Sequence, residues 1–380
     1  MNISFLSSGH YPYDDRIFYH LGKSLSENGH KVEITSSKSN EKVQTEGISC
    51  NCFEGDSLAK SEKTERFIKY LENFEPDVII CSEPLPVLAA RRYKRKAHRK
   101  IRIIYDITEW YPSKKNLVQK KTVRKCITFF KLLLFNIHSS SLADAFIFGE
   151  WYKSKPYRLL FPFKPFIFTT YYPDLRYIRY KEPGLTPGKL RLSYSGKINL
   201  EKGFSNFIKV IKGLSMLHPD LRIEVKITGW FESDNDRKEC EPFIKDENSK
   251  IDLVMSGRQN FIDFNRQLNE TDIFLDLRAD TLENQHCLPI RLFYYAANGR
   301  PVVFSDLKAI RREVEIEKFG FLVKPRNTDS IVSIISEYLG KSELYYRHCR
   351  EARALAERKY NWKSISAEFM KFIESPVSQR

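Results

Sequence analysis

Two lysines stand five positions apart in the stretch YSGKINLEKGF, residues 194–204. A strand is predicted to end at Gly196 and a helix to begin at Gly203, so Lys197 and Lys202 would lie in the loop between them. Two ammonium groups, a close backbone and a helix N-terminus together favour a diphosphate as the ligand. The spacing is not that of a Walker P-loop, and lysines that are merely solvated are the alternative.

A second stretch, LPIRLFYYAANGRPVVFSD at 288–306, places Arg291 and Tyr294 on one predicted helix ahead of a predicted strand. An arginine near a helix start can fork onto phosphate oxygens, and Tyr294 offers one uncharged hydroxyl to a sugar. Gly229 follows another predicted strand and marks a place where backbone can approach a ligand closely. As alternatives, the helix of Arg291 and Tyr294 would simply pack its aromatic side chains in the core, and Gly229 would be an ordinary turn glycine.

The sequence SSGH at 7–10 directly follows the first predicted strand. Gly9 allows backbone to approach a ligand, and the next helix would point its positive N-terminus toward the same place. His10, Asp14 and Arg16 would lie beside this possible ligand site. The alternative is a polar turn in which an aspartate caps the helix.

Carboxylates and aromatics also follow a predicted strand in YDITEWYP, residues 105–112. Asp106 and Glu109 lie beside Trp110 and Tyr111, a combination typical of sugar sites, because a pyranose has an apolar face and a ring of hydroxyls. As alternatives, Asp106 would cap a helix and Trp110 would belong to the core.

Short apolar runs alternate with longer amphipathic ones along most of the chain, which predicts mostly parallel sheets covered on both faces. The alternation is interrupted at 170–189, a stretch rich in proline and glycine that reads as a linker. The prediction is an α/β protein with two doubly wound domains, 1–180 and 181–360. Ligands of such sheets bind beyond the carboxyl ends of the strands, so a cleft between the domains is the expected site.

The 380 residues carry a formal net charge of +15, which indicates an acidic partner: nucleic acid, an anionic membrane surface or a phosphorylated substrate. Basic residues are concentrated at 91–102 and 114–137, and the second segment also has an apolar half. Such a segment favours a helix in an anionic membrane interface, with a solvated basic face as the alternative. No nucleic-acid-binding signature is present, and the apolar run at 126–137 is too short to span a bilayer.

The seven cysteines are scattered without a CxxC pair, which argues against disulfides and a zinc site and favours a reducing cytoplasm. The N-terminus lacks the pattern of a signal peptide. Because no Asp-x-Asp pair stands beside a predicted donor strand, neither a metal nor another cofactor is predicted.

Together these pieces resemble the retaining GT-B glycosyltransferases of the family 4 type, the glycosyl transferases group 1. The resemblance covers nearly the whole chain and includes YSGKINLEKGF, ITGW, GFLVKP and KYNW. Its most specific part is 289–302, which parallels the family pattern Pro-x-Lys-x-x-Glu-Tyr-x-Ala-x-Gly-x-Pro-Val.

The resemblance implies two Rossmann-like domains facing across a cleft, with the donor nucleotide on the second and a C-terminal helix, 361–380, crossing back to the first. Lys197 stands where the family has a phosphate-binding arginine, Lys202 matches its phosphate-binding lysine, and Arg291 replaces a lysine. Gly196 and Gly229 belong to the same donor site.

The sequence departs from the family at two glutamates eight residues apart, which are here His286 and Tyr294. Glu283 is a candidate for the missing contact to the ribose. Thr108 stands where many relatives have an acceptor-site histidine. These departures raise the alternative of a weakly active or inactive GT-B scaffold in a polysaccharide assembly complex.

The expected function is transfer of a sugar from a nucleotide diphosphate sugar to a lipid-linked or glycan acceptor in bacterial surface polysaccharide biosynthesis. The enzyme would work on the inner face of the plasma membrane. Lys197, Lys202 and Arg291 would neutralise the leaving diphosphate. His10 is a candidate catalytic residue together with Lys197 and Lys202. The acceptor would be bound and oriented by residues of the first domain: Gly9, His10, Asp14, Arg16 and Glu109.

Overall fold

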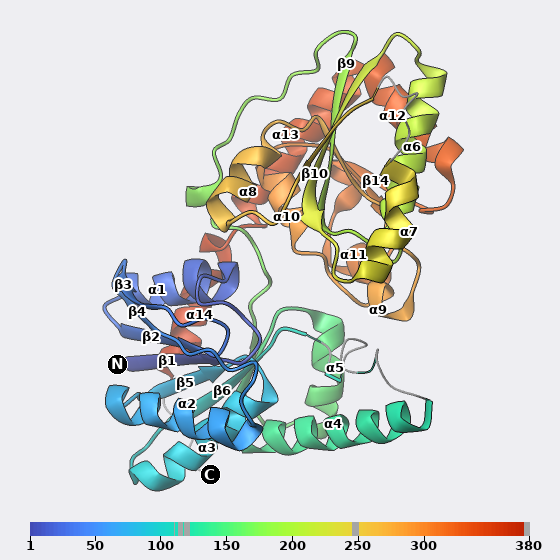
Figure 1. Ribbon diagram of the computed structural model, residues 1–380. Coiled ribbons are helices and arrows are strands. Elements are labelled where there is room, and N and C mark those ends of the chain that lie inside the picture. The colour runs from blue at the N-terminus through green and yellow to red at the C-terminus, as the bar shows by residue number, and fades with distance from the viewer. Residues whose placement is uncertain (110, 113–116, 118–121, 245–250, 376–380) are drawn as a thin grey trace. The chain divides into compact units, whose positions relative to one another are not determined.

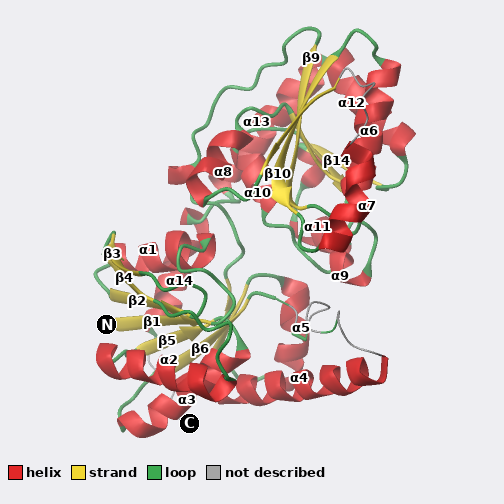
Figure 2. Cartoon of the chain, viewed as in Figure 1, coloured by secondary structure: helices red, strands yellow, loops and turns green. Residues whose placement is uncertain are grey.

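The computed structural model describes residues 1–109, 111–112, 117, 122–244 and 251–375 (Figure 1). The chain divides into two compact units. The first comprises Met1–Tyr171 with Ile365–Arg380, and the second comprises Tyr172–Ser364. In each unit a central sheet is covered by helices, as the colouring in Figure 2 makes clear. The predicted α/β class with two Rossmann-like sheets is confirmed.

The first unit has an eight-stranded sheet in the order β3-β4-β2-β1-β5-β6-β7-β8. Neighbouring strands are parallel, except that β3 runs antiparallel to β4. The strands are β1 (Asn2–Ser7), β2 (Lys31–Ser36), β3 (Lys42–Thr45), β4 (Ile48–Asn51), β5 (Val78–Cys81), β6 (Arg102–Ile107), β7 (Ala145–Phe148) and β8 (Phe166–Phe168). The order reverses between β1 and β5, so a crevice is expected at the carboxyl ends of these two strands.

The helices of this unit are η1 (Asp15–Gly22), α1 (Lys23–Glu27), α2 (Lys60–Phe74), α3 (Pro84–Ala97), α4 (Thr122–Leu142), α5 (Trp151–Leu160) and α14 (Lys363–Glu374). The helix predicted after the SSGH loop is a π-helical segment, η1, that continues into α1. Asp14 caps it by accepting hydrogen bonds from the backbone N–H groups of Arg16 and Ile17. Helix α14 is joined to the sheet by Arg102, whose Nη1 donates to the carbonyl oxygens of Phe372 and Ile373.

The second unit has a fully parallel six-stranded sheet in the order β11-β10-β9-β12-β13-β14. Its strands are β9 (Lys189–Lys197), β10 (Arg222–Trp230), β11 (Ile251–Ser256), β12 (Ile273–Asp276), β13 (Val302–Ser305) and β14 (Gly320–Val323). Here the order reverses between β9 and β12, so a second crevice is expected at the carboxyl ends of these strands.

Helices cover both faces of this sheet: α6 (Phe204–Leu217), α7 (Asp234–Ile244), α8 (Phe261–Leu268), α9 (Leu282–Gln285), α10 (Arg291–Ala297), α11 (Lys308–Glu313), α12 (Thr328–Gly340) and α13 (Ser342–Arg358). Alternate side chains of one strand enter opposite cores, as the pleat requires. Ile273 and Leu275 of β12 pack in the core with α6 and α12, whereas Phe274 packs with α10 and α13. The unit is therefore doubly wound.

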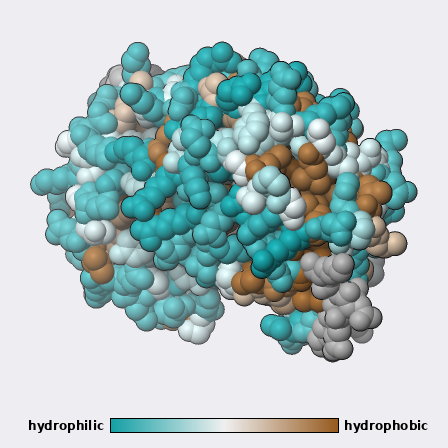
Figure 3. Space-filling model, turned by 90° about the horizontal axis from the view of Figure 1, so that it is seen from above, coloured by the Kyte–Doolittle hydropathy of each residue, from teal (hydrophilic) through white to brown (hydrophobic). Residues whose placement is uncertain are grey.

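Some elements differ from the sequence expectation. The hairpin β3–β4 and helix α3 were not indicated by periodicity, because α3 reads as a basic run behind Pro84 and Pro86. The linker predicted at 170–189 contains one 3-10 turn, η3 (Leu175–Tyr177). No helix in the described ranges has both the length and the apolar character needed to cross a bilayer. Hydrophilic residues cover most of the face in Figure 3, and hydrophobic ones gather in one area of it.

Candidate active site

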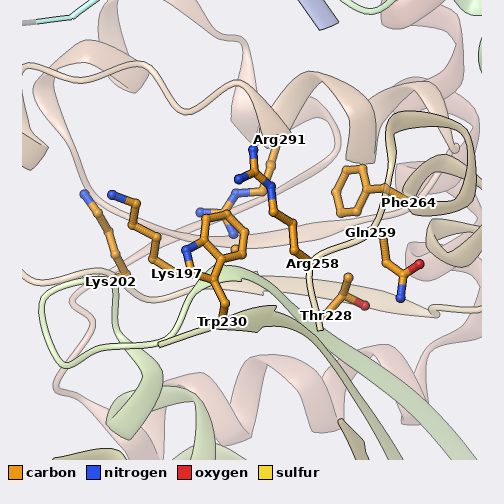
Figure 4. A pocket seen from close by; sticks show the side chains of 9 residues that line it. Lys197, Lys202, Thr228, Trp230, Arg258, Gln259, Phe264 and Arg291 are labelled. Carbon is orange, nitrogen blue, oxygen red and sulfur yellow. The ribbon is translucent and has the colours of Figure 1, made fainter. Parts of the chain in front are cut away.

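A pocket of about 380 Å³ lies in the second unit at the carboxyl ends of β9 and β10. Four of its lining side chains are cationic and two are aromatic, and in Figure 4 they surround one space. Lys197 and Lys202 extend side by side in the same direction, next to the indole of Trp230. The lining residues are Gly196, Lys197, Lys202, Thr228, Trp230, Arg258, Gln259, Phe264 and Arg291.

Two glycines let the strand ends come close to the pocket. Gly196 has a φ of +103°, a conformation that side chains rarely allow, and a Cβ there would lie 2.8 Å from Nη1 of Arg291. A Cβ at Gly229 would overlap the carbonyl oxygen of Gly196, which is its register partner on β9. Gly196 therefore lines the pocket with bare backbone, whereas Gly229 is buried beside it and lets β9 and β10 pack closely; Gly229 itself does not line the pocket.

The ammonium group of Lys202 is half enclosed and is oriented by a buried amide. Its Nζ donates to Oδ1 of Asn284 at 3.1 Å, and the amide nitrogen of Asn284 donates to the carbonyl oxygen of Ala279 at 2.8 Å. Burial lowers the pKa of Lys202, and the nearby charge of Arg278 acts in the same direction. A bound anion would offset both effects, so this position favours an anionic ligand.

Arg291 begins helix α10, and that helix is fixed against the sheet. The hydroxyl groups of Tyr295 and Ser195 hydrogen-bond at 2.7 Å, and the Tyr295 ring stacks on Phe274 with 3.9 Å between centroids. The Arg291 guanidinium lies 3.7 Å from Asp276. Asp276 already accepts two hydrogen bonds from the buried Arg278, at 2.8 and 2.5 Å. Arg291 therefore shares its counter-ion and stays available to a ligand.

The other side of the pocket combines charge with aromatic surface. Lys197 is partly exposed and pairs with Glu232 at 2.5 Å. The guanidinium of Arg258 lies 5.2 Å from the centre of the Trp230 ring, and Phe264 lines the pocket beyond it. Planar aromatic surfaces beside cations suit a nucleotide, which has a flat base and an anionic diphosphate.

The first unit brings the SSGH loop together with a carboxylate that the sequence analysis missed. Glu83 precedes α3 and accepts hydrogen bonds from Oγ of Ser7 at 3.0 Å and from the backbone N–H of Ser8 at 2.7 Å. A Cβ on Gly9 would lie 2.7 Å from the same carboxylate. The crevice predicted by the strand order between β1 and β5 is thus the place where the loop and Glu83 meet.

His10 is held between two carboxylates in this crevice. Its Nδ1 lies 2.9 Å from Asp14, and its Nε2 lies 3.7 Å from Glu83. Burial by itself would lower the pKa of His10, but the hydrogen bond and charge of Asp14, together with the charges of Glu83 and Glu109, raise the pKa to about 10. His10 is therefore an imidazolium at neutral pH, a donor and a cation rather than a general base.

Arg16 lies deeper than the sequence predicted. The guanidinium donates to both carboxylate oxygens of Asp106 at 2.7 Å and to the carbonyl and hydroxyl oxygens of Thr169 at 2.7 and 2.6 Å. Its other contact is the ring of Tyr171, 4.3 Å away. Only 1% of Arg16 is exposed. Arg16 and Asp106 therefore join η1, β6 and the segment after β8, and a contact of Arg16 with an acceptor has no support in this geometry.

The remaining predicted site residues are placed as follows. Tyr294 is 2% exposed and packs its ring edge-on against Phe261, in the core between the sheet and α13, so its predicted contact with ribose has no support from the pocket. Glu283 lies on α9, near enough to Lys202 for its charge to act on that group. Glu109 is exposed after β6, and Trp110 lies outside the described residues.

Sequence reasoning missed Trp230 and Arg258 as parts of this pocket. A usable signal existed, because each stands at or just after the carboxyl end of a predicted parallel strand, where ligands of such sheets bind. It also missed the buried ion pair of Asp276 and Arg278, because two residues at a strand end can be seen in the sequence but the pairing of their side chains cannot.

Residues 180–355 match the family model of the glycosyl transferases group 1. No curated protein matches the chain by sequence. Among solved structures, sucrose-phosphate synthase from Thermosynechococcus elongatus superposes with a TM-score of 0.74 at 13% identity, covering 98% of each chain.

HepE from Anabaena in complex with UDP-glucose gives a TM-score of 0.72 at 13% identity over 99% of this chain and 100% of that chain. WaaG, a glycosyltransferase involved in lipopolysaccharide biosynthesis, gives 0.69 at 12% identity over 98% and 100%. At these identities the structural matches establish the GT-B fold. The family match identifies residues 180–355, most of the second unit, as a glycosyl transferases group 1 domain.

Proposed function

We propose that this protein is a retaining glycosyltransferase that moves a sugar from a nucleotide diphosphate sugar to a lipid-linked or glycan acceptor in bacterial surface polysaccharide biosynthesis. The observation that carries the donor part is the shared pocket of Lys197, Lys202 and Arg291. Three cations around one space match the charge of a diphosphate, and the enclosed position of Lys202 strengthens their effect.

In the proposed reaction the bond between the sugar carbon and the diphosphate oxygen breaks, and the nucleoside diphosphate leaves with the electron pair. Lys197, Lys202 and Arg291 stabilise the negative charge that develops on that oxygen. The acceptor hydroxyl bonds to the same face of the sugar, which retains its configuration, and its proton passes to the leaving phosphate. The base would lie against Trp230 and Phe264.

The acceptor is assigned to the crevice of the first unit. The imidazolium of His10, held by Asp14 and Glu83, can donate a charge-assisted hydrogen bond to an acceptor hydroxyl or phosphate. Glu109 is exposed beyond β6, and its carboxylate can accept from sugar hydroxyls. This acceptor site stays a proposal that its polar groups support.

A membrane-bound acceptor is supported by helix α4. Val123, Ile127, Phe130 and Leu134 are between 50% and 72% exposed, and their 4-3-4 spacing places them on one side of the helix. Arg124, Lys125 and Lys131 are exposed on the same helix. Such a helix suits the interface of an anionic bilayer. Most of the predicted basic segment before α4 lies outside the described residues. The role of WaaG in lipopolysaccharide biosynthesis fits this setting.

Donor hydrolysis by the purified chain, measured with a panel of UDP, GDP and TDP sugars, tests the proposal. We expect turnover with one nucleotide and a rise in melting temperature with the matching nucleoside diphosphate. The absence of both turnover and thermal protection across the panel would leave a non-catalytic scaffold as the better interpretation.

A further inference from the structure

A second pocket, of about 1050 Å³, lies in the first unit at the opposite end of the sheet from the His10 crevice. Arg102 is the first residue of β6, Asp144 directly precedes β7, and Pro165 directly precedes β8. The last residues of α4 and of α14 complete the wall. This pocket is therefore at the amino ends of the strands, away from the side of the sheet to which the proposed reaction is assigned.

The pocket has an excess of positive charge. Arg91, Arg102 and Lys164 line it together with a single carboxylate, Asp144. That carboxylate accepts hydrogen bonds at 2.8 Å from Lys94 and from the backbone N–H of Ile103, so its charge is already matched. Within the described part of the chain, none of the three lining cations forms a salt bridge.

Two of these cations, Arg91 and Arg102, keep unused donors, whereas the ammonium group of Lys164 donates to the carbonyl oxygens of Ser140, Ser141 and Ala143 at the end of α4. The Nε of Arg91 is buried and has no hydrogen-bond partner among the described residues. Arg102 donates through Nη1 to the end of α14, while its Nε and Nη2 form no hydrogen bond to a described residue. Burial lowers the pKa of Lys164 to about 8; Asp144 opposes this effect and the neighbouring charge of Arg91 adds to it. An anion near Arg91 and Arg102 would relieve this unbalanced charge.

One wall and rim of the same pocket are apolar. Leu160, Phe161, Pro162, Phe163 and Pro165 line it, with Leu160 52% exposed and Phe163 74% exposed. Leu159, the preceding residue of α5, is 81% exposed. Large apolar side chains that project into water beside an enclosed cationic group match a ligand that is anionic at one end and apolar at the other.

We propose that this pocket binds the phosphate head group of an anionic phospholipid, with Leu160 and Phe163 entering the acyl region. The proposal rests on the membrane association in the proposed function and adds a specific lipid site to it. A free phosphate ester has the same anionic chemistry, but it would leave the apolar rim, with Leu160 and Phe163, exposed to water. The bilayer is the one occupant that accounts for the cations and the rim together.

Co-sedimentation with vesicles of phosphatidylcholine containing phosphatidylglycerol tests the site in the full chain. Arg91→Gln is expected to lower the partition coefficient about five-fold, the effect of one cation near an anionic leaflet. Arg92→Gln is the matched control, because it removes the same charge from the neighbouring position, which is outside the pocket and pairs with Glu65 at 3.7 Å. Arg92→Gln is expected to change the partition coefficient less than two-fold.

The apolar rim is tested in the same assay. Phe163→Ser should lower partitioning about ten-fold, whereas Met216→Ser, at an 84% exposed position of the second unit, should leave it unchanged. Glycerol 1-phosphate carries the head group without the acyl region, so it should bind the wild type much more weakly than vesicles do. Binding of glycerol 1-phosphate as strong as vesicle binding, with Phe163→Ser partitioning like the wild type, would identify a soluble phosphate ester instead and overturn the proposal.

The outcomes separate this site from the proposed reaction. Equal losses from Arg91→Gln and Arg92→Gln would show a diffuse charge effect and overturn the pocket, while wild-type binding would still support membrane association. No binding of the wild type to any vesicle would overturn the pocket and the membrane part of the proposed function together. Donor hydrolysis, which uses the second unit, reports separately whether the enzyme is active.

Discussion

Arg16 and Arg291 each stand in the first turn of a helix beside a parallel sheet, but their charges are used differently. Arg16 is 1% exposed, and Asp106 and Thr169 accept four hydrogen bonds from its guanidinium. Arg291 has one ionic contact among the described residues, 3.7 Å from an aspartate that Arg278 already engages. The comparison teaches that a cation near a strand end indicates a ligand site only when the fold leaves its charge unmatched.

The largest effect, on stability, is expected from breaking the buried ion pair of Arg16 and Asp106. Arg16→Met leaves Asp106 buried without its counter-ion, which should lower the free energy of unfolding by about 3–5 kcal/mol in urea titration. Arg291→Met should lower it by less than about 1 kcal/mol, because its pair is looser and partly exposed. Adding Asp106→Leu to Arg16→Met should recover part of the loss. Similar stability losses at both arginines would remove the distinction between them.

The next effect concerns turnover. Lys202→Ala removes an enclosed ammonium from the proposed diphosphate site and should reduce kcat about 10²- to 10³-fold, the effect of removing one donor to a developing charge. Lys100→Ala, at an exposed position of the first unit, removes the same charge and should be nearly silent. If steady-state kinetics showed the same modest loss for both, Lys202 would have no special contact with the donor.

A third prediction uses the charge of His10. Its pKa of about 10 lies above the ordinary value of 6.5, so its ion pairs stabilise the fold fully below pH 6.5 and progressively less as the pH rises toward 10. His10→Gln should therefore lower the free energy of unfolding by about 1–3 kcal/mol at pH 6. The difference from wild type should shrink by pH 10. His138→Gln, on the exposed side of α4, is the control substitution.

The α/β fold and the place of the donor pocket could be predicted from the sequence. The fold follows from hydrophobic periodicity, and the pocket follows from the residues that stand at strand ends. The loop of Lys197 and Lys202 was predicted because it follows the buried strand β9 and precedes the amphipathic helix α6. Parallel sheets place such loops at one edge, so the shared pocket with Arg291 follows from topology.

The orientation of single side chains could not be predicted in the same way. Every residue of α10 from Leu292 to Ala297 is buried, since the helix lies between the sheet and α13, so its sequence has no polar face to indicate which way Tyr294 points. Arg16 and Glu83 depend on partners 90 and 75 residues away in the chain. Contacts between residues so far apart in the chain depend on tertiary packing, so local sequence patterns do not predict them.

The smallest expected effect, on ligand binding, compares Trp230 with Lys202 within the pocket of the second unit. Trp230→Ala removes the surface against which the base would stack and should weaken binding of a nucleoside diphosphate about two- to ten-fold. Inorganic pyrophosphate, which has no base, should bind this variant as it binds the wild type, whereas Lys202→Ala should weaken both ligands. Isothermal titration of the two ligands against the two variants measures this difference. Loss of pyrophosphate binding in Trp230→Ala would mean that the indole supports the cations rather than the base.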